Sequence, residues 1–154
     1  MKNFSKLLLV LFTQILIFSC SHYDQVQGDI KESGSGEGSH NSGKNCGSCH
    51  NKNGTEAALE GWWTISGTAY YPNGALHPNA TIQLWEKPNK QGKLIKSLVS
   101  DSKGNFYTNQ IINFNNGCFI NISSGINSNN MSQSFNGGSC NSCHGISTAK
   151  ITVN

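Results

Sequence analysis

The chain of 154 residues contains no arginine, and its eleven basic side chains are all lysines. Charged residues make up 12% of the sequence, and eight acidic residues nearly balance the lysines. A nucleic-acid-binding domain needs a basic patch or stripe, and arginine supplies most of the bidentate contacts to bases and phosphates. The composition therefore gives no support to nucleic-acid binding.

Long apolar runs are also missing, apart from residues 7–18, which two polar residues interrupt. This run is shorter than the roughly 20 apolar residues that a membrane-spanning helix needs. Lys2 and Lys6 precede it, and a basic region followed by a short apolar run is typical of a secretory signal. We therefore expect residues 1–19 to be a signal peptide.

The apolar run ends in Ile17-Phe18-Ser19-Cys20. This ending resembles a bacterial lipobox, in which an aliphatic residue and then a small residue precede cysteine. The resemblance implies that Cys20 is lipidated. Because Ser21 follows and the aspartate that retains lipoproteins at the inner membrane is missing, it also implies a lipid anchor in the outer membrane, on its periplasmic or cell-surface face. The alternative is an ordinary cleaved signal that leaves Cys20 as a stray thiol.

Four of the six cysteines lie in two copies of the pattern Cys-x-x-Cys-His, at residues 46–50 and 140–144. This pattern is the attachment signature of c-type haem. Residues three apart on a helical turn share a face, so the two thiols can form thioethers with the two haem vinyl groups. The histidine that follows binds the iron as the proximal axial ligand. The sequence thus predicts two covalently attached haem c groups, held by Cys46, Cys49 and His50 and by Cys140, Cys143 and His144.

Other uses of the Cys-x-x-Cys pairs are a tetrahedral zinc site, two local disulfides and a thioredoxin-like redox pair. A zinc site would leave the histidine after each pair without a role, and such sites are usually found in reducing compartments. A thioredoxin-like pair needs a βαβ context, which neither copy has. Disulfides are the simple alternative for an exported protein.

The last cysteine, Cys118, begins a predicted strand at 118–122. Alternation places Cys118, Ile120 and Ile122 on one face, so we expect a buried thiol that acts as a small apolar side chain. Because haem and lipid take the other five cysteines, no structural disulfide is available, and the domain must depend on its core and on covalent haem.

The region between the two Cys-x-x-Cys-His copies has a sequence pattern typical of β-structure. Short segments rich in β-branched and aromatic residues alternate with turns that contain Gly, Pro and Asn, which is typical of a small antiparallel sandwich. The alternation places Ala80, Ile82 and Leu84 inward, and the polar residues 123–139 read as a loop. About five strands are expected, at 62–71, 80–85, 94–100, 106–114 and 118–122.

The segment after Cys20 is dense in Gly, Ser and acidic residues and has too few apolar residues to fold alone. We therefore expect a disordered, flexible tether there. The fold class is then mainly β, a small sandwich flanked by two haem attachment segments. The expected parts are a signal peptide (1–19), a tether (20–44), a first haem-binding segment (45–60), a β-sandwich (61–123), and a loop with the second haem-binding segment (124–154).

Three motifs follow one another within the predicted sandwich, at residues 67–70, 79–84 and 101–106 (Asp-Ser-Lys-Gly-Asn-Phe). Their order resembles a carboxypeptidase-regulatory-like β-sandwich, although Asn79 stands where that family commonly has glycine. With the flanking Cys-x-x-Cys-His copies, residues 39–145 resemble a group of exported bacterial dihaem proteins in which such a sandwich is inserted between the haem motifs. This resemblance implies electron transfer.

Few residues qualify as the second axial ligand of each iron. His40 lies six residues before Cys46 and could bind over its own haem or cross to the second, whereas Met131 lies nine residues before Cys140 in a polar loop. The family resemblance favours His40 and Met131, with His77 as a weaker candidate. Methionine ligation raises the reduction potential relative to histidine. Electron transfer from a bis-histidine haem to a neighbouring His/Met haem would therefore be favourable.

These features predict a lipid-anchored dihaem cytochrome c that relays single electrons to other redox proteins or extracellular acceptors. An electron carrier is favoured over an enzyme because the distal candidates are enough to fill the second axial position of both irons. One alternative is a haem peroxidase or small-molecule reductase. The other is a binding module with secondary haems, in which Trp62, Trp63 and Trp85 form a platform. Because tryptophan side chains are largely buried on average, we expect instead that these rings cover the haems or fill the sandwich edge.

Overall fold

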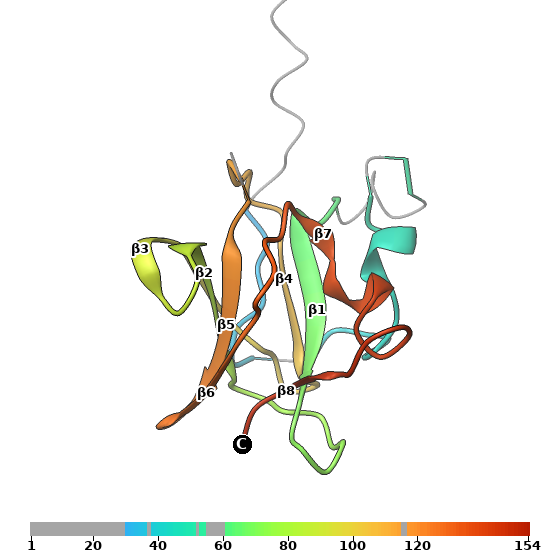
Figure 1. The fold of residues 1–154 in the computed structure, drawn as a ribbon. Coiled ribbons are helices and arrows are strands. Elements are labelled where there is room, and N and C mark those ends of the chain that lie inside the picture. The colour runs from blue at the N-terminus through green and yellow to red at the C-terminus, as the bar shows by residue number, and fades with distance from the viewer. Residues whose placement is uncertain (1–29, 37, 52, 55–60, 115–116) are drawn as a thin grey trace, which may run out of the picture.

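The computed structural model describes residues 30–36, 38–51, 53–54, 61–114 and 117–154. These residues form eight strands in two four-stranded sheets, as expected for a mainly β protein, and they contain no α-helix (Figure 1). None of the described helical turns is long and apolar enough to cross a membrane. The predicted signal peptide and its lipidation residue Cys20 lie outside the described residues.

Strand β1 lies at the centre of the first sheet. β4 pairs with it antiparallel along one edge, whereas β7 and β8 pair with it in parallel along the other. β7 contacts the beginning of β1 and β8 contacts its end, so the chain between them leaves and then rejoins the same edge. The bounds are Ile65–Tyr70 for β1, Asn105–Thr108 for β4, Gly138–Ser139 for β7 and Ile151–Thr152 for β8.

The second sheet is antiparallel, in the order β3-β2-β5-β6. Its bounds are Gln91–Val99 for β3, Thr81–Lys87 for β2, Phe119–Ser124 for β5 and Asn127–Asn130 for β6.

The hydrophobic core lies between the two sheets, and the alternation in the sequence locates much of it. Ala80, Ile82 and Leu84 are completely buried, and Cys118 is buried beside Ile120 and Ile122. Both predicted inward faces are therefore confirmed. From the first sheet, the same core receives Ile65, Ala69 and Phe106.

The number and direction of the strands differ from the expectation of about five antiparallel strands. β6 and β7 both fall within residues 123–139, so the prediction of a loop is wrong for these positions. β6 consists of Asn and Ser and is exposed along its length. As an edge strand it is held by backbone pairing with β5, which requires no apolar side chain and leaves no hydrophobic pattern in the sequence.

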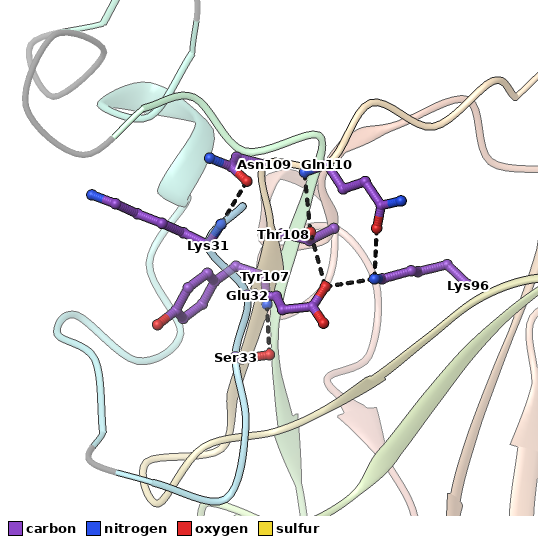
Figure 2. Close-up of polar contacts among 8 residues, drawn as sticks. All are labelled: Lys31, Glu32, Ser33, Lys96, Tyr107, Thr108, Asn109 and Gln110. Atoms are coloured by element: carbon purple, nitrogen blue, oxygen red, sulfur yellow. Dashed lines mark hydrogen bonds and ion pairs between the residues drawn. The ribbon is translucent and has the colours of Figure 1, made fainter. Parts of the chain in front are cut away.

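Residues 30–33 lie alongside β4 (Figure 2). The backbone N–H of Ser33 donates to the carbonyl of Tyr107 at 2.9 Å, and the Tyr107 N–H donates to Ser33 Oγ at 3.0 Å. The Glu32 carboxylate forms an ion pair with Lys96 of β3 at 2.5 Å. These residues belong to the segment predicted as a tether, and its described part therefore packs on the first sheet.

Truncation of Ile82 tests the core. Ile82 is completely buried in β2, so Ile82→Ala removes apolar contacts, leaves a cavity and should lower the free energy of unfolding by about 2–4 kcal/mol. Ile126, between β5 and β6, is fully exposed, so Ile126→Ala should change it by less than about 0.5 kcal/mol. Chemical denaturation of both variants measures the difference, and equal losses would contradict the placement of the core.

Candidate functional site

The two Cys-x-x-Cys-His motifs adopt the same backbone conformation. Each begins with a short 3-10 turn, η1 (Cys46–Ser48) and η2 (Cys140–Ser142). The N–H of His50 donates to the carbonyl of Cys46 at 2.8 Å, and the corresponding bond from His144 to Cys140 measures 2.9 Å. The predicted helical turn is thus present at both motifs, and it fixes each histidine directly after its cysteine pair.

His50 of the first motif is buried, with 4% of its surface exposed. Its Nδ1 lies 3.3 Å from the carbonyl oxygen of Gly61, to which it donates. This tautomer puts the lone pair on Nε2, the nitrogen that a metal would bind. The ring stacks on Trp63 with 4.9 Å between centroids, and Trp63 in turn packs 4.7 Å from Tyr107. The imidazole is therefore oriented from two sides.

A cavity of about 1020 Å³ opens beside the first motif and is lined by Cys46, Cys49 and His50 together with His40. The ring centroids of His40 and His50 are 5.8 Å apart. A metal bound between two imidazoles, with metal–nitrogen bonds of about 2 Å on each side, requires roughly 6 Å between the ring centres. The centroid separation of the two histidine rings in this cavity is therefore compatible with a haem iron held between them.

His40 lies in a loop of residues 39–44, the His40 loop, which the turn before β4 holds in place. The carboxylate of Asp101, which is 1% exposed, accepts hydrogen bonds from Ser39 N at 2.8 Å and Ser39 Oγ at 2.7 Å. The side-chain amide of Asn105 donates to the carbonyl of His40 at 3.3 Å and to Ser42 Oγ at 3.1 Å. The loop is thus bonded to the sheet on both sides of His40.

The second motif uses the same device for its histidine. The Nδ1 of His144 donates to the carbonyl of Ala149 at 2.7 Å. This carbonyl is within reach because the chain turns back after the motif, where Cys143 O accepts the N–H groups of Ser147 and Thr148. The lone pair again falls on Nε2.

A second cavity, of about 590 Å³, is lined by Cys140, Cys143 and His144 and also by Met131. Met131 is fixed by its backbone N–H, which donates to the carbonyl of Ile120 at 2.8 Å. The structure therefore brings His40 into the cavity of the first motif and Met131 into that of the second. Both volumes are of the order of known ligand pockets, roughly 300–1,000 Å³.

The two motifs are neighbours in space. Figure 1 shows η1 and η2 next to each other, on the side of β1 that faces away from β2 and β5. The side-chain amide of Asn141 in the second motif donates to the carbonyl of Lys44, just before the first motif, at 3.0 Å. A Cβ atom placed on Gly47 would lie 3.1 Å from the Cβ of Ser139. Any two groups attached to these motifs would therefore be held in one unit.

The five described cysteines all carry free thiols in the structure. Across the ranges that the structure describes, no group of three or more His, Cys, Asp or Glu side chains is arranged to hold a metal ion. The cysteine pairs thus line two separate cavities and do not assemble a tetrahedral site.

His77, the weaker ligand candidate, lies elsewhere. It is 3% exposed, its ring stacks on Tyr71 at 3.7 Å, and its Nδ1 donates to the carbonyl of Pro78 at 3.0 Å. It is not among the residues that line the two motif cavities. The turn that carries it packs His77 against Tyr71 and does not bring it to either motif.

The three tryptophans do not share one surface. Trp63 packs against His50 in the first cavity. Trp62 lines a small apolar cavity of about 320 Å³ with Trp63, whereas Trp85 lies on β2 opposite Phe119 of β5. The ring of Trp63 thus covers the first motif, as burial habits favour.

Sequence reasoning missed three polar residues that connect the two motifs, namely Thr68, Asn105 and Asn141. All three are at least 97% buried, and although each lies within a motif of the sequence, no motif gives it a role in connecting the two cysteine pairs. Thr68 occupies the face of β1 opposite its core face, and every residue of β1 is buried. A signal was present in the alternation of Thr64, Ser66 and Thr68 on a strand with little charge, but nothing in the sequence says what covers that face.

Family models, curated proteins and solved structures give no significant match to the chain. The resemblances to a carboxypeptidase-regulatory-like sandwich and to exported dihaem proteins therefore stay predictions. Function has to be inferred from the residues of the chain and from their geometry.

Burial raises the pKa of the Cys140 thiol to about 12 and that of the Cys118 thiol to about 11. Folding therefore favours the protonated thiol. For Cys118 this contribution is complete below the ordinary pKa of 9.0 and is lost as the pH rises towards 11.

The wild-type free energy of unfolding should accordingly fall between pH 9 and 11 by up to about 2 kcal/mol more than that of a Cys118→Ala variant, because each pKa unit corresponds to about 1.4 kcal/mol. Denaturation curves recorded at half-unit steps of pH measure this difference. Parallel pH profiles for the two proteins would contradict the burial of the thiol.

Proposed function

We propose that the chain is a dihaem c-type cytochrome that relays single electrons at the outer membrane, to which lipidated Cys20 anchors it. One observation carries this proposal. Each Cys-x-x-Cys-His motif has its histidine Nδ1 bonded to a backbone carbonyl, and each faces a cavity that is also lined by a candidate for the second axial ligand, His40 or Met131.

The residues divide the work between attachment and ligation. Cys46 and Cys49 would hold the first haem and Cys140 and Cys143 the second, through thioether bonds to the haem vinyl groups. Bound haem supplies an iron that changes between the ferrous and ferric states and so carries one electron. His50 and His144 would supply the proximal ligands. Their Nδ1 bonds to carbonyl groups fix the ring orientation and raise the basicity of Nε2.

The distal donors make the two sites unequal. His40 with His50 would give a bis-histidine site, whereas Met131 with His144 would give a methionine–histidine site of higher potential. Because Asn141 of the second motif bonds to Lys44, just before the first, the two haems would lie close enough together for an electron that enters at the first site to pass to the second. The direction of transfer is then set by the ligands.

The lysines of the chain suit the charged edge of the group. Lys31 and Lys44 line the first cavity and Lys150 lines the second. Haem carries propionate carboxylates, which pair with ammonium groups through charge-assisted hydrogen bonds. Among the described residues that line the two cavities, these lysines are the cations that can do so.

The electron-carrier function is favoured over a haem peroxidase or small-molecule reductase because such an enzyme needs an open coordination position, and each cavity already holds a distal donor. It is favoured over a tryptophan-based binding module because Trp63 packs against a proximal histidine. Redox proteins or extracellular electron acceptors are the partners that this function requires.

Haem content tests the proposal directly. The full chain, expressed with a cytochrome c maturation system, should show a mass increase of two haems and a pyridine haemochrome spectrum of two haems per chain. The double variant Cys46→Ser/Cys49→Ser should lose one haem, because it loses both thioether bonds at one site. Cys118→Ser is the matched control and should keep two. A wild-type mass without haem, with zinc or disulfides in its place, would overturn the proposal.

Replacement of Met131 tests the inequality of the sites. Met131→His should abolish the charge-transfer absorption of a methionine-ligated ferric haem and lower one of the two reduction potentials by on the order of 100 mV, since axial ligation sets haem potentials. His77→Gln is the control and should leave both spectra and potentials unchanged. An unchanged potential in Met131→His would exclude Met131 as a ligand, and carbon monoxide binding by the wild type would favour the enzyme alternative.

A further inference from the structure

The hydroxyl of Thr68 lies where the two candidate haem sites meet. Thr68 is completely buried in β1. Its Oγ1 accepts hydrogen bonds from Gly43 N and from Asn141 Nδ2, both at 2.9 Å, and donates to Asn105 Oδ1 at 2.7 Å. A hydroxyl has one donor and two acceptor positions, so these three bonds satisfy it completely.

Two of these bonds lead to the His40 loop. Gly43 belongs to the loop itself, three residues after His40. Asn105, whose Oδ1 receives the Thr68 proton, uses its Nδ2 to donate to the carbonyl of His40 and to Ser42 Oγ. The Thr68 bond fixes the orientation of this amide, because Oδ1 is turned towards Thr68 and Nδ2 towards the loop.

The third bond leads to the second motif. Asn141 Nδ2 donates to Thr68 Oγ1 and also to the carbonyl of Lys44 at the end of the His40 loop, at 3.0 Å. Its Oδ1 accepts the backbone N–H of Thr68 at 3.2 Å. A side chain of the second attachment motif thus helps to hold the loop that carries the distal ligand candidate of the first.

We infer that Thr68 is a positioning residue for the distal ligand of the first haem, and that its hydroxyl holds the His40 loop so that His40 stays on the iron opposite His50. The inference rests on the proposed function. It deepens that function by making the closure of the first iron depend on a hydroxyl that contacts neither haem ligand. The Met131 site is held by backbone pairing with Ile120 and does not depend on this hydroxyl.

The test compares three variants of the full holoprotein with the wild type. Thr68→Val keeps the shape of the side chain and removes the three hydroxyl bonds, whereas Thr68→Ser keeps the hydroxyl. Thr64→Val is the matched control, because Thr64 is buried just before β1 and its Oγ1 has no hydrogen-bond partner in the structure. Intact mass first establishes two haems in each protein. Carbon monoxide binding by the reduced proteins is then titrated.

Thr68→Val should bind about one equivalent of carbon monoxide per chain and retain the absorption of the methionine-ligated haem. The wild type, Thr68→Ser and Thr64→Val should bind essentially none. A folded Thr68→Val protein that binds no carbon monoxide would overturn the inference. So would loss of the methionine signal in that variant, or binding to the first haem of the wild type.

A second variant decides the matter should Thr68→Val fail to fold. Ser39→Ala removes, from the partly exposed loop, a hydroxyl that donates to Asp101 and accepts from Asn105. It should also raise carbon monoxide binding at the first haem, by a smaller fraction, and no rise would count against the inference. A wild-type chain without haem gives a different result, since it overturns the proposed function and this inference with it.

Discussion

Strand β1 is buried on both faces and paired along both edges, and the rest of the structure depends on this. A buried backbone N–H without a partner costs about 1–3 kcal/mol, so each N–H of β1 needs a hydrogen-bond acceptor. β4 supplies the acceptors along one edge. On the other edge β7 and β8 leave a gap at Thr68, and there Asn141 Oδ1 accepts the N–H. The second Cys-x-x-Cys-His motif therefore lies in the segment between β7 and β8, the two strands that pair with this edge of β1.

The same constraint explains why so many polar groups lie at the centre of the candidate site. Thr68, Asn105 and Asp101 are all buried, and the hydrogen bonds among them and the His40 loop satisfy their side chains. Hydrogen bonds in surroundings of low dielectric constant are stronger than in water and hold a network rigid when every member is satisfied. A rigid loop suits an axial ligand that has to stay bound in both oxidation states of an iron.

The sequence allowed the local features to be predicted and left the long-range ones open. The Cys-x-x-Cys-His spacing and the alternation of Ala80, Ile82 and Leu84 are properties of short segments, and the structure has the expected turns and buried face. β6 was missed because backbone pairing and the side-chain amide of Asn121 hold it, and neither leaves a hydrophobic pattern in the sequence. The bonds between Thr68 and Asn141 join residues 73 positions apart, and no short pattern encodes such a pairing. For the same reason the sequence could name His40, Met131 and His77 but could not say that the first two would line the motif cavities and the third would not.

Cys140 is 7% exposed, and burial raises the pKa of its thiol to about 12. The thiolate is the reactive form of cysteine. Folding therefore keeps the Cys140 thiol in its protonated form, which reacts less readily with a vinyl group. Under the proposed function, thioether formation at Cys140 would therefore be favoured in a chain that has not yet folded. Strand β8 lies downstream of the motif, and its pairing with β1 would then enclose a haem that is already attached. Under the proposed function, the order of haem attachment and folding would thus decide whether the second motif is loaded.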